Sequence, residues 1–149
     1  MNAIHRTRGF SLIELLTVIA VVALLAGLAL SSYMNQSRES HRTEAKTAVL
    51  DLAGREERNY STTNTYTTAT AALGYNTAAF PFNTINNYYS LNVVVVPAAP
   101  PVAATYTITA TAIGDQANDA TCAVYTYTQA GVQSATTNGG ADSTATCWK

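Results

Sequence analysis

The sequence has few charged side chains, and they carry no surplus of positive charge. Eight basic and nine acidic residues among 149 give a formal net charge of −1 at pH 7. Proteins that bind nucleic acid without sequence preference usually present a marked excess of Lys and Arg. We therefore do not expect nucleic acid as a partner. Ten of the charged residues fall between residues 38 and 58, and beyond them only four remain: Asp115, Asp119, Asp142 and Lys149.

The groups that most enzymes need are also scarce. Of two histidines, His5 lies near the start of the chain, and His41 lies on a charged segment where a solvated helix face is the commoner role. The sequence shows no glycine-rich phosphate loop, no spacing typical of metal ligands, and no nucleophile beside a base. Asp115 and Asp119 share one loop and could bind calcium, but acids that merely solvate a loop are far commoner. We expect no enzyme, no cofactor and no metal site.

What the chain does have is one long apolar run. The 21 residues from Phe10 to Leu30 would form a helix about 31 Å long, the thickness of a bilayer's hydrocarbon core. Glu14 is the one ionisable side chain in this run, and an acid kept there suggests a cationic partner in some assembled state. Arg6 and Arg8 precede the run, and basic residues beside a first apolar helix tend to stay in the cytoplasm. The part of the chain after the apolar run should therefore lie outside the cytoplasm, on the other side of the membrane.

An ordinary secretory signal is the alternative interpretation of this end of the chain. A basic start, an apolar run and the small-residue pattern Ala29-Leu30-Ser31 are typical of such a signal. However, a secretory signal gains nothing from an acid at the entrance of its apolar region, so Glu14 stays unexplained. A plain membrane anchor leaves the same question open.

The residues Gly9-Phe10-Ser11-Leu12-Ile13-Glu14 ahead of an apolar helix resemble the class III signal of type IV prepilins. The resemblance implies that prepilin peptidase cleaves between Gly9 and Phe10 and methylates the new amino terminus of Phe10. It also implies that Glu14 is the acid used in assembly with other pilin subunits by the pilus assembly machinery. The precursor would cross the inner membrane once, with its head in the periplasm, before joining an extracellular pilus.

The two cysteines lie on the side expected to face an oxidising compartment, where disulfides form and persist. We expect Cys122 and Cys147 to pair. A pair of free thiols or a metal site is the alternative, although the sequence has neither a CxxC motif nor a histidine close to either cysteine.

The apolar run continues into a mixed-charge segment without Gly or Pro until Gly54. This pattern predicts one helix from Ser11 to about Tyr60. Apolar residues recur at helical spacing and form one stripe: Ala45, Ala48, Val49, Leu52 and Ala53. Two opposite-charge pairs, Glu39 with Arg42 and Asp51 with Arg55, can form across helical turns.

The remainder is polar and rich in Thr, Asn and Tyr, as in short strands and loops. β-branched and aromatic residues predict a strand at 88–96, and alternation predicts strands at 105–113 and 121–128. A turn signal at 129–131 precedes a short strand at 132–136, and a meander is the simplest connection of the four. Aromatic side chains within the preceding segment, 61–87, should hold that loop against the domain. The tyrosines of the strand segments, Tyr88, Tyr89, Tyr125 and Tyr127, are more often packing residues than a platform for adhesion or DNA contact.

Together these elements predict an α+β fold, in which a long N-terminal helix packs on a four-stranded antiparallel sheet. The resemblance to pilins implies the same fold. We divide the chain into a leader peptide at 1–9, a membrane or filament-core half of the helix at 10–31, an outer half at 32–60, and a head at 61–149 that ends in a disulfide-bounded loop.

Several segments outside the signal resemble the E-type (PilE-like) minor pilins of type IVa pili, among them Thr43-Glu-Ala-Lys46, Leu73-Gly-Tyr75 and the closing Cys147-Trp148. The resemblance implies a structural minor pilin of a filament for motility or adhesion. A major pilin and a type II secretion pseudopilin are close alternatives, and a membrane-anchored periplasmic binding module is the alternative of another class. Many pilins carry a proline just after the apolar run, where this chain has Leu30-Ser31-Ser32.

Overall fold

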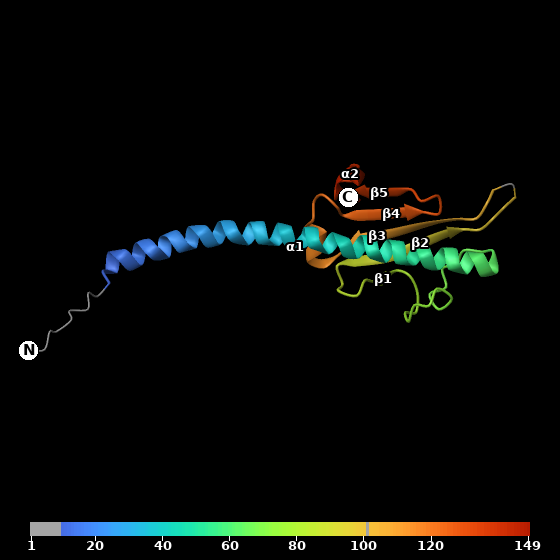
Figure 1. Ribbon diagram of the computed structural model, residues 1–149, viewed down its shortest axis with the longest axis horizontal. Coiled ribbons are helices and arrows are strands. Elements are labelled where there is room, and N and C mark those ends of the chain that lie inside the picture. The colour runs from blue at the N-terminus through green and yellow to red at the C-terminus, as the bar shows by residue number, and fades with distance from the viewer. Residues whose placement is uncertain (1–9, 101) are drawn as a thin grey trace, which may run out of the picture. The chain divides into compact units, whose positions relative to one another are not determined.

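The computed structural model describes residues 10–100 and 102–149, without the side chains of residues 29–31 (Figure 1). The chain divides into two compact units, one ending at Gln36 and the other running from Ser37 to Lys149. The long helix α1, Leu12–Thr63, contributes to both. Its start and end lie within three residues of the predicted ones, and its backbone stays helical through the segment that lacks proline.

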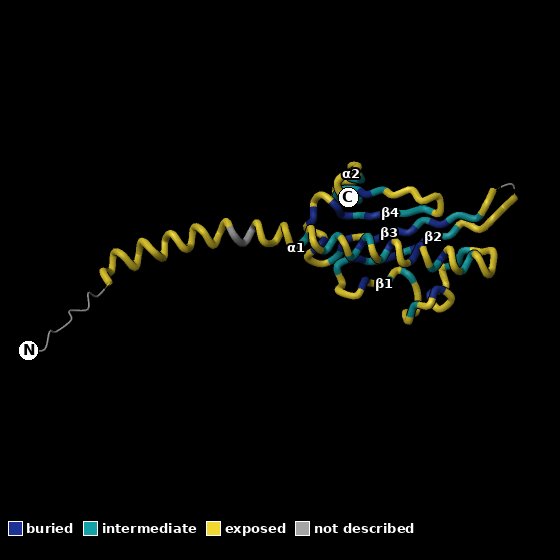
Figure 2. The backbone as a smooth tube through the Cα atoms, in the orientation of Figure 1, coloured by how far each residue is buried: buried dark blue, intermediate teal, exposed yellow. Residues whose placement is uncertain are grey.

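The first unit is apolar on every side of its helix. Large side chains from Phe10 to Leu28 are more than half exposed, with Phe10 at 81% and Leu24 at 73% (Figure 2). Among the described residues, α1 is the one helix long and apolar enough to cross a membrane. A helix with no polar side requires a membrane or other apolar helices around it.

The second unit has two layers, because the C-terminal part of α1 covers one face of a five-stranded antiparallel sheet (Figure 1). The strands follow one another in chain order, so the predicted meander is confirmed. The strand bounds are β1 Phe82–Asn83, β2 Tyr89–Val96, β3 Thr105–Ala112, β4 Val124–Thr128 and β5 Gln133–Thr136. A 3-10 helix η1, Gly114–Asn118, and a short helix α2, Thr144–Cys147, complete the unit.

The sheet has five strands where the sequence predicts four. The additional strand β1 pairs Phe82 with Leu91 and Asn83 with Ser90 along the edge of β2. It lies in a segment predicted to be a loop, and two residues are too few to show an alternating pattern. The strand is therefore set by its pairing with β2 rather than by a local preference.

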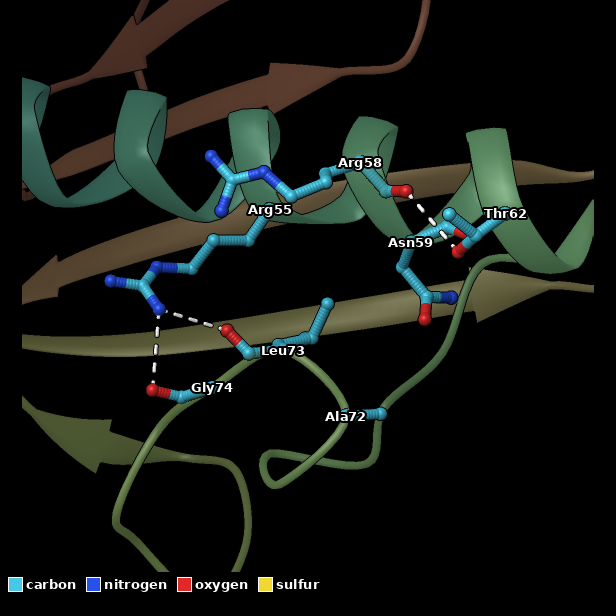
Figure 3. Close-up of a pocket in the computed structure, with 7 residues that line it drawn as sticks. All are labelled: Arg55, Arg58, Asn59, Thr62, Ala72, Leu73 and Gly74. Carbon is cyan, nitrogen blue, oxygen red and sulfur yellow. Dashed lines mark hydrogen bonds between the residues drawn. The ribbon is translucent and has the colours of Figure 1, made fainter.

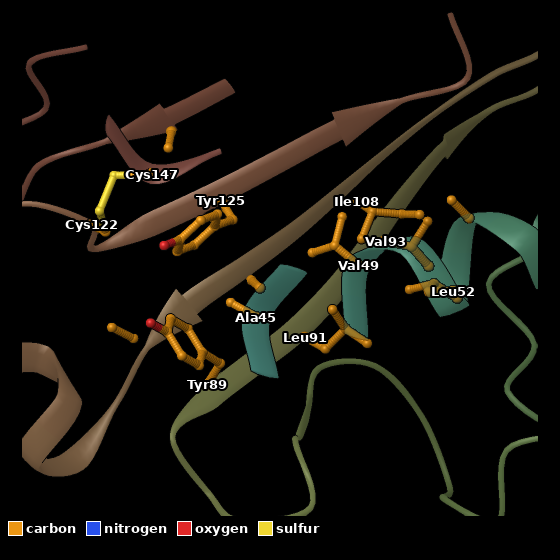
Figure 4. Packing of buried hydrophobic residues seen from close by; sticks show 14 of the residues in the cluster. Ala45, Val49, Leu52, Tyr89, Leu91, Val93, Ile108, Cys122, Tyr125 and Cys147 are labelled. Atoms are coloured by element: carbon orange, nitrogen blue, oxygen red, sulfur yellow. A yellow bond between two sulfur atoms is a disulfide. The ribbon is translucent and has the colours of Figure 1, made fainter. Parts of the chain in front are cut away.

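The core forms between the predicted helical stripe and the inner face of the sheet (Figure 4). Ala45, Val49 and Leu52 of α1 are fully buried. On β3, alternate side chains point inward, and Tyr106 and Ile108 are at most 2% exposed. Burying side chains of this size stabilises a domain by roughly 1.5 to 3 kcal/mol each. The predicted α+β architecture with a single core is thus confirmed.

The loop between α1 and β2 is held by aromatic contacts, as the sequence predicts. Tyr66 stacks on Tyr60 with 4.6 Å between ring centroids and meets Tyr106 edge-on at 4.7 Å. Tyr75 and Phe82 lie 5.0 Å apart and pack against the core. These contacts fix the loop that forms one wall of the pocket described below.

Candidate functional site

The N-terminal end of α1 is the first candidate site, because the sequence places cleavage, methylation and assembly there. Gly9 lies outside the described residues. Phe10 and Glu14 line the same shallow pocket of about 170 Å³, together with Leu15 and Val18. The structure therefore brings the expected methylation residue next to the expected assembly acid. Within the described chain no Lys, Arg or His lies within salt-bridge distance of Glu14.

The two loop acids considered for calcium have other partners in the second unit. The Asp119 carboxylate accepts hydrogen bonds from Arg42 Nε at 2.7 Å and Nη2 at 2.9 Å. Asp115 lies 3.4 Å from Arg38. No group of three or more His, Cys, Asp or Glu that could hold a metal occurs in the described part of the chain. Both acids instead join the η1 region to α1.

Asp119 also explains why β4 starts at Val124 and not at Thr121 as predicted. Its Oδ1 accepts hydrogen bonds from the backbone N–H groups of Thr121 at 3.1 Å and Cys122 at 3.2 Å. Cys122 is bonded to Cys147 as a disulfide, the pairing that the sequence favours. These side-chain contacts take the place of sheet pairing at the start of the segment.

His41 occupies a packed position rather than the solvated face expected from the sequence. Its ring stacks on Tyr88, with 3.6 Å between centroids and an angle of 11° between the planes. His41 Nδ1 lies 3.2 Å from Gln116 Oε1. The histidine thus links α1 to the residue just before β2 and to η1.

A cationic pocket of about 290 Å³ lies between α1 and the loop before β1 (Figure 3). Its helix wall consists of Arg55, Arg58, Asn59 and Thr62, and its loop wall of Ala72, Leu73 and Gly74. No acidic side chain belongs to this lining. In Figure 3 the side chains of Arg55 and Arg58 extend in the same direction, and Asn59 points toward Ala72.

Arg55 fixes the loop wall of this pocket. Its Nη1 donates to the carbonyl oxygens of Leu73 at 2.9 Å and Gly74 at 3.2 Å, and its Nε donates to Asp51 at 2.8 Å. Gly74 has a φ of +73°, and a Cβ there would lie 3.1 Å from Arg55 Nη1. Glycine is therefore the residue that permits both this backbone conformation and the close approach of the arginine.

The pocket was not predicted from the sequence, although the sequence contains a signal for it. Positions 55, 58, 59 and 62 follow the i, i+3, i+4, i+7 spacing of a single helix face. This polar face adjoins the apolar stripe and carries two arginines. Its loop wall depends on long-range packing, which the spacing does not reveal.

Comparison with known proteins identifies the family. Residues 31–126 match the sequence model described as "Type IV minor pilin ComP, DNA uptake sequence receptor", which covers more than half of the chain. The chain belongs to this family of type IV minor pilins. Residues 4–30 of this minor pilin match the prokaryotic N-terminal methylation motif. The two matches together cover residues 4–126, from the segment before the apolar run into β4.

A curated relative is the type IV major pilin protein PilA of Myxococcus xanthus strain DK1622. It is 31% identical over 70 residues, which cover 47% of this minor pilin and 32% of the relative. The chain thus spans about a third of that relative's length.

The family match confirms the predictions that the chain is a pilin and that it is a structural protein without enzymatic activity. It also supports the interpretation as a minor pilin. The E-type subtype is not confirmed. The description of the family names a DNA uptake sequence receptor, which conflicts with our expectation that nucleic acid is no partner. That expectation depended on the charge of the whole chain, and a net charge does not report local clusters such as Arg55 with Arg58.

Proposed function

We propose that this minor pilin binds DNA through its head while its N-terminal helix holds it in the inner membrane or in a pilus. The observation that carries the proposal is the match of residues 31–126 to a family of DNA uptake sequence receptors. This match includes the C-terminal part of α1 and most of the sheet. We therefore propose recognition of incoming DNA in place of motility or adhesion, the output expected from the sequence.

The N-terminal end supports processing and assembly. Cleavage between Gly9 and Phe10 would create a free amine at Phe10, the residue that lines the same pocket as Glu14. In apolar surroundings the attraction between this amine and the Glu14 carboxylate would be much stronger than in water. The precursor lacks that amine, so processing would permit assembly. The exposed apolar side chains of this segment would exchange lipid for neighbouring pilin helices.

The head has a charge pattern compatible with DNA recognition. From Ser37 onward it carries six basic and eight acidic side chains, so nonspecific attraction to DNA is weak overall. Several acids are already paired with arginines, among them Asp51, Asp115 and Asp119. Their negative charge is locally compensated. A DNA receptor with this balance of basic and acidic side chains would bind through a few defined contacts. It would not bind through the attraction of DNA to an overall positive surface.

Equilibrium binding of fluorescein-labelled duplexes to the full-length protein in detergent micelles tests the DNA proposal. Duplexes are cut from the genome of the producing bacterium and compared with duplexes of the same composition but shuffled sequence. We expect a subset of genomic duplexes to bind at least tenfold more tightly than their shuffled counterparts at physiological salt, a modest value for specific recognition. The proposal would be overturned if genomic and shuffled duplexes bind equally tightly. It would also be overturned if no duplex binds even at low salt.

Intact-mass measurement of protein from native membranes and sheared pili tests the processing proposal. We expect a chain that starts at Phe10 with one added methyl group. Its mass should increase by two hydrogens on reduction, because Cys122 and Cys147 are bonded. A retained Met1 in cells with active peptidase would identify a permanent anchor, and a start near Ser31 would identify an ordinary secretory signal.

A further inference from the structure

Arg58 differs from most other basic side chains of the head. Arg38 pairs with Asp115, Arg42 with Asp119, and Arg55 with Asp51, while Lys46 donates to the Lys149 carbonyl at 2.8 Å. For Arg58 and Lys149, by contrast, the described part of the head provides no hydrogen bond or ion pair to the charged group. Arg58 lines the cationic pocket, and Lys149 does not belong to that lining.

The pocket around Arg58 has the chemistry of an anion site. Its lining combines two guanidinium groups with a threonine hydroxyl and an amide, and it contains no carboxylate. Asn59 Nδ2 already donates to the Thr65 carbonyl at 2.7 Å, so this side chain is fixed in orientation. The Thr62 hydroxyl donates to the Asn59 carbonyl at 2.9 Å and retains its capacity to accept.

The walls of the pocket are fixed before any ligand binds. Arg55 connects α1 to the Leu73 and Gly74 carbonyls, and its guanidinium lies 4.4 Å from the centroid of the Tyr75 ring. Arg55 is therefore a positioning residue whose own charge is largely used within the chain. Arg58 is exposed and available. The loop wall is therefore ordered before a ligand binds, and the Arg58 side chain is the part of the lining that would lose conformational freedom on binding.

We propose that this pocket holds one phosphodiester group of bound DNA, with Arg58 donating hydrogen bonds to its oxygens and Arg55 fixing the opposite wall. The inference rests on the proposed DNA-binding function and specifies where the backbone is held. A guanidinium presents a planar set of donors that matches two phosphate oxygens at once. The pocket lies near the C-terminal end of α1, where the helix dipole disfavours anions. Binding of phosphate here would therefore depend strongly on the arginine.

Arg58→Ala and Lys149→Ala form a matched pair that tests the proposal, because each removes one unpaired positive charge. Binding of a tightly bound genomic duplex is measured with the full-length protein in micelles over a range of salt concentrations. We expect Arg58→Ala to weaken binding close to tenfold near 0.1 M salt and to reduce the slope of log K against log salt by about one. Lys149→Ala should change binding less than twofold. Arg58→Lys should recover part of the loss, because it restores the charge without the planar fork.

The outcomes separate this inference from the proposed function. If the wild-type protein binds no DNA, the proposed function fails. If it binds DNA and the two alanine variants bind equally well, the pocket is not the phosphate site, although the function stands. An equal loss in both variants would also overturn the inference, because it would reflect net charge alone. Far-ultraviolet circular dichroism and the intact disulfide show that each variant is folded, as the exposed position of Arg58 leads us to expect.

Discussion

Arg42 and Asp119 form a two-pronged ion pair between α1 and the segment that follows η1, with N–O distances of 2.7 and 2.9 Å. The Asp119 side chain is 3% exposed and that of Arg42 is 16% exposed. The same carboxylate also receives the N–H groups of Thr121 and Cys122. One buried acid therefore joins the helix to the segment before β4 that carries Cys122 of the disulfide.

Asp119→Ala should destabilise the head by about 3 to 5 kcal/mol, because it leaves Arg42 without its buried partner. The free energy of unfolding can be followed by urea titration, with the fluorescence of Trp148, the chain's single tryptophan, as the signal. Asp115→Ala is the control, since Asp115 is 72% exposed and its pair with Arg38 should contribute less than about 1 kcal/mol. Equal losses in the two variants would show that the buried pair has no special role.

The Asp119 pair also predicts a loss of stability in acid. Burial by itself would raise the pKa of Asp119, but the hydrogen bonds and charge of Arg42, with the N–H groups of Cys122 and Thr121, lower it below its ordinary value of 3.8. The carboxylate therefore contributes stability above that value and loses it as the pH falls further, through the lowered pKa. Urea titrations of wild type and Asp119→Ala should converge in this acidic range. A constant difference down to pH 2 would contradict the prediction.

Glu56 should have the opposite pH dependence. It is fully buried, its Oε2 accepts from the backbone N–H of Thr67 at 3.1 Å, and its Oε1 has no hydrogen-bond partner. Burial, reinforced by the charge of Glu57 and opposed by the Thr67 hydrogen bond, raises the pKa of Glu56 above its ordinary value of 4.5. Folding thus favours the protonated form, so stability is highest below that value and falls as the pH rises through the raised pKa.

Glu56→Gln should remove this decline and make the head at least as stable as wild type at pH 7, because an amide keeps an acceptor without a buried charge. Urea titrations between pH 4 and 8 measure the effect. Glu57→Gln serves as the control, since Glu57 is exposed and accepts a hydrogen bond from Tyr66 at its surface. A Glu56→Gln variant that retains the pH dependence of wild type would assign the decline to another group.

The Cys122–Cys147 disulfide closes a loop with a sequence separation of 25 residues. In the chain-entropy description a loop of this length stabilises the folded state by about 3 to 4 kcal/mol. Replacement of both cysteines by alanine should lower the free energy of unfolding by that amount, as measured by urea titration under the same conditions. A change below about 1 kcal/mol would show that contacts such as Trp148 with Tyr125 and Ser134 hold the C-terminal segment without the bond.

Glu14→Gln should reduce incorporation into pili without affecting cleavage or methylation. The variant keeps the size of the side chain and removes the charge that would pair with the Phe10 amine. Quantitative mass spectrometry of the membrane and sheared fractions measures both effects. Mature Glu14→Gln protein should accumulate in the membrane, and normal incorporation would exclude the charge pair as a step in assembly.

Most of the fold could be predicted from local patterns. The helical stripe around Val49 and the alternation of β3 each bury one face, so periodicity determines which side chains form the core. Strand β1 was not predicted, because the extended conformation of its two residues depends on their pairing with Leu91 and Ser90. The cationic pocket was not predicted either, because its loop wall is held by a hydrogen bond from Arg55 to Leu73, which is 18 residues away in sequence. The expectation that nucleic acid is no partner was based on the net charge of the whole chain. It did not consider which positive charges remain in one place after ion pairs have formed.

The proposed role in DNA recognition is tested most directly by sequencing the DNA retained by sheared pili from cells with and without this minor pilin. Pili that contain the wild-type chain should retain DNA enriched in a recurrent short sequence, and this enrichment should disappear from pili of cells that lack it. The same enrichment in the absence of the chain would show that another subunit binds the DNA, and would contradict its role as a receptor.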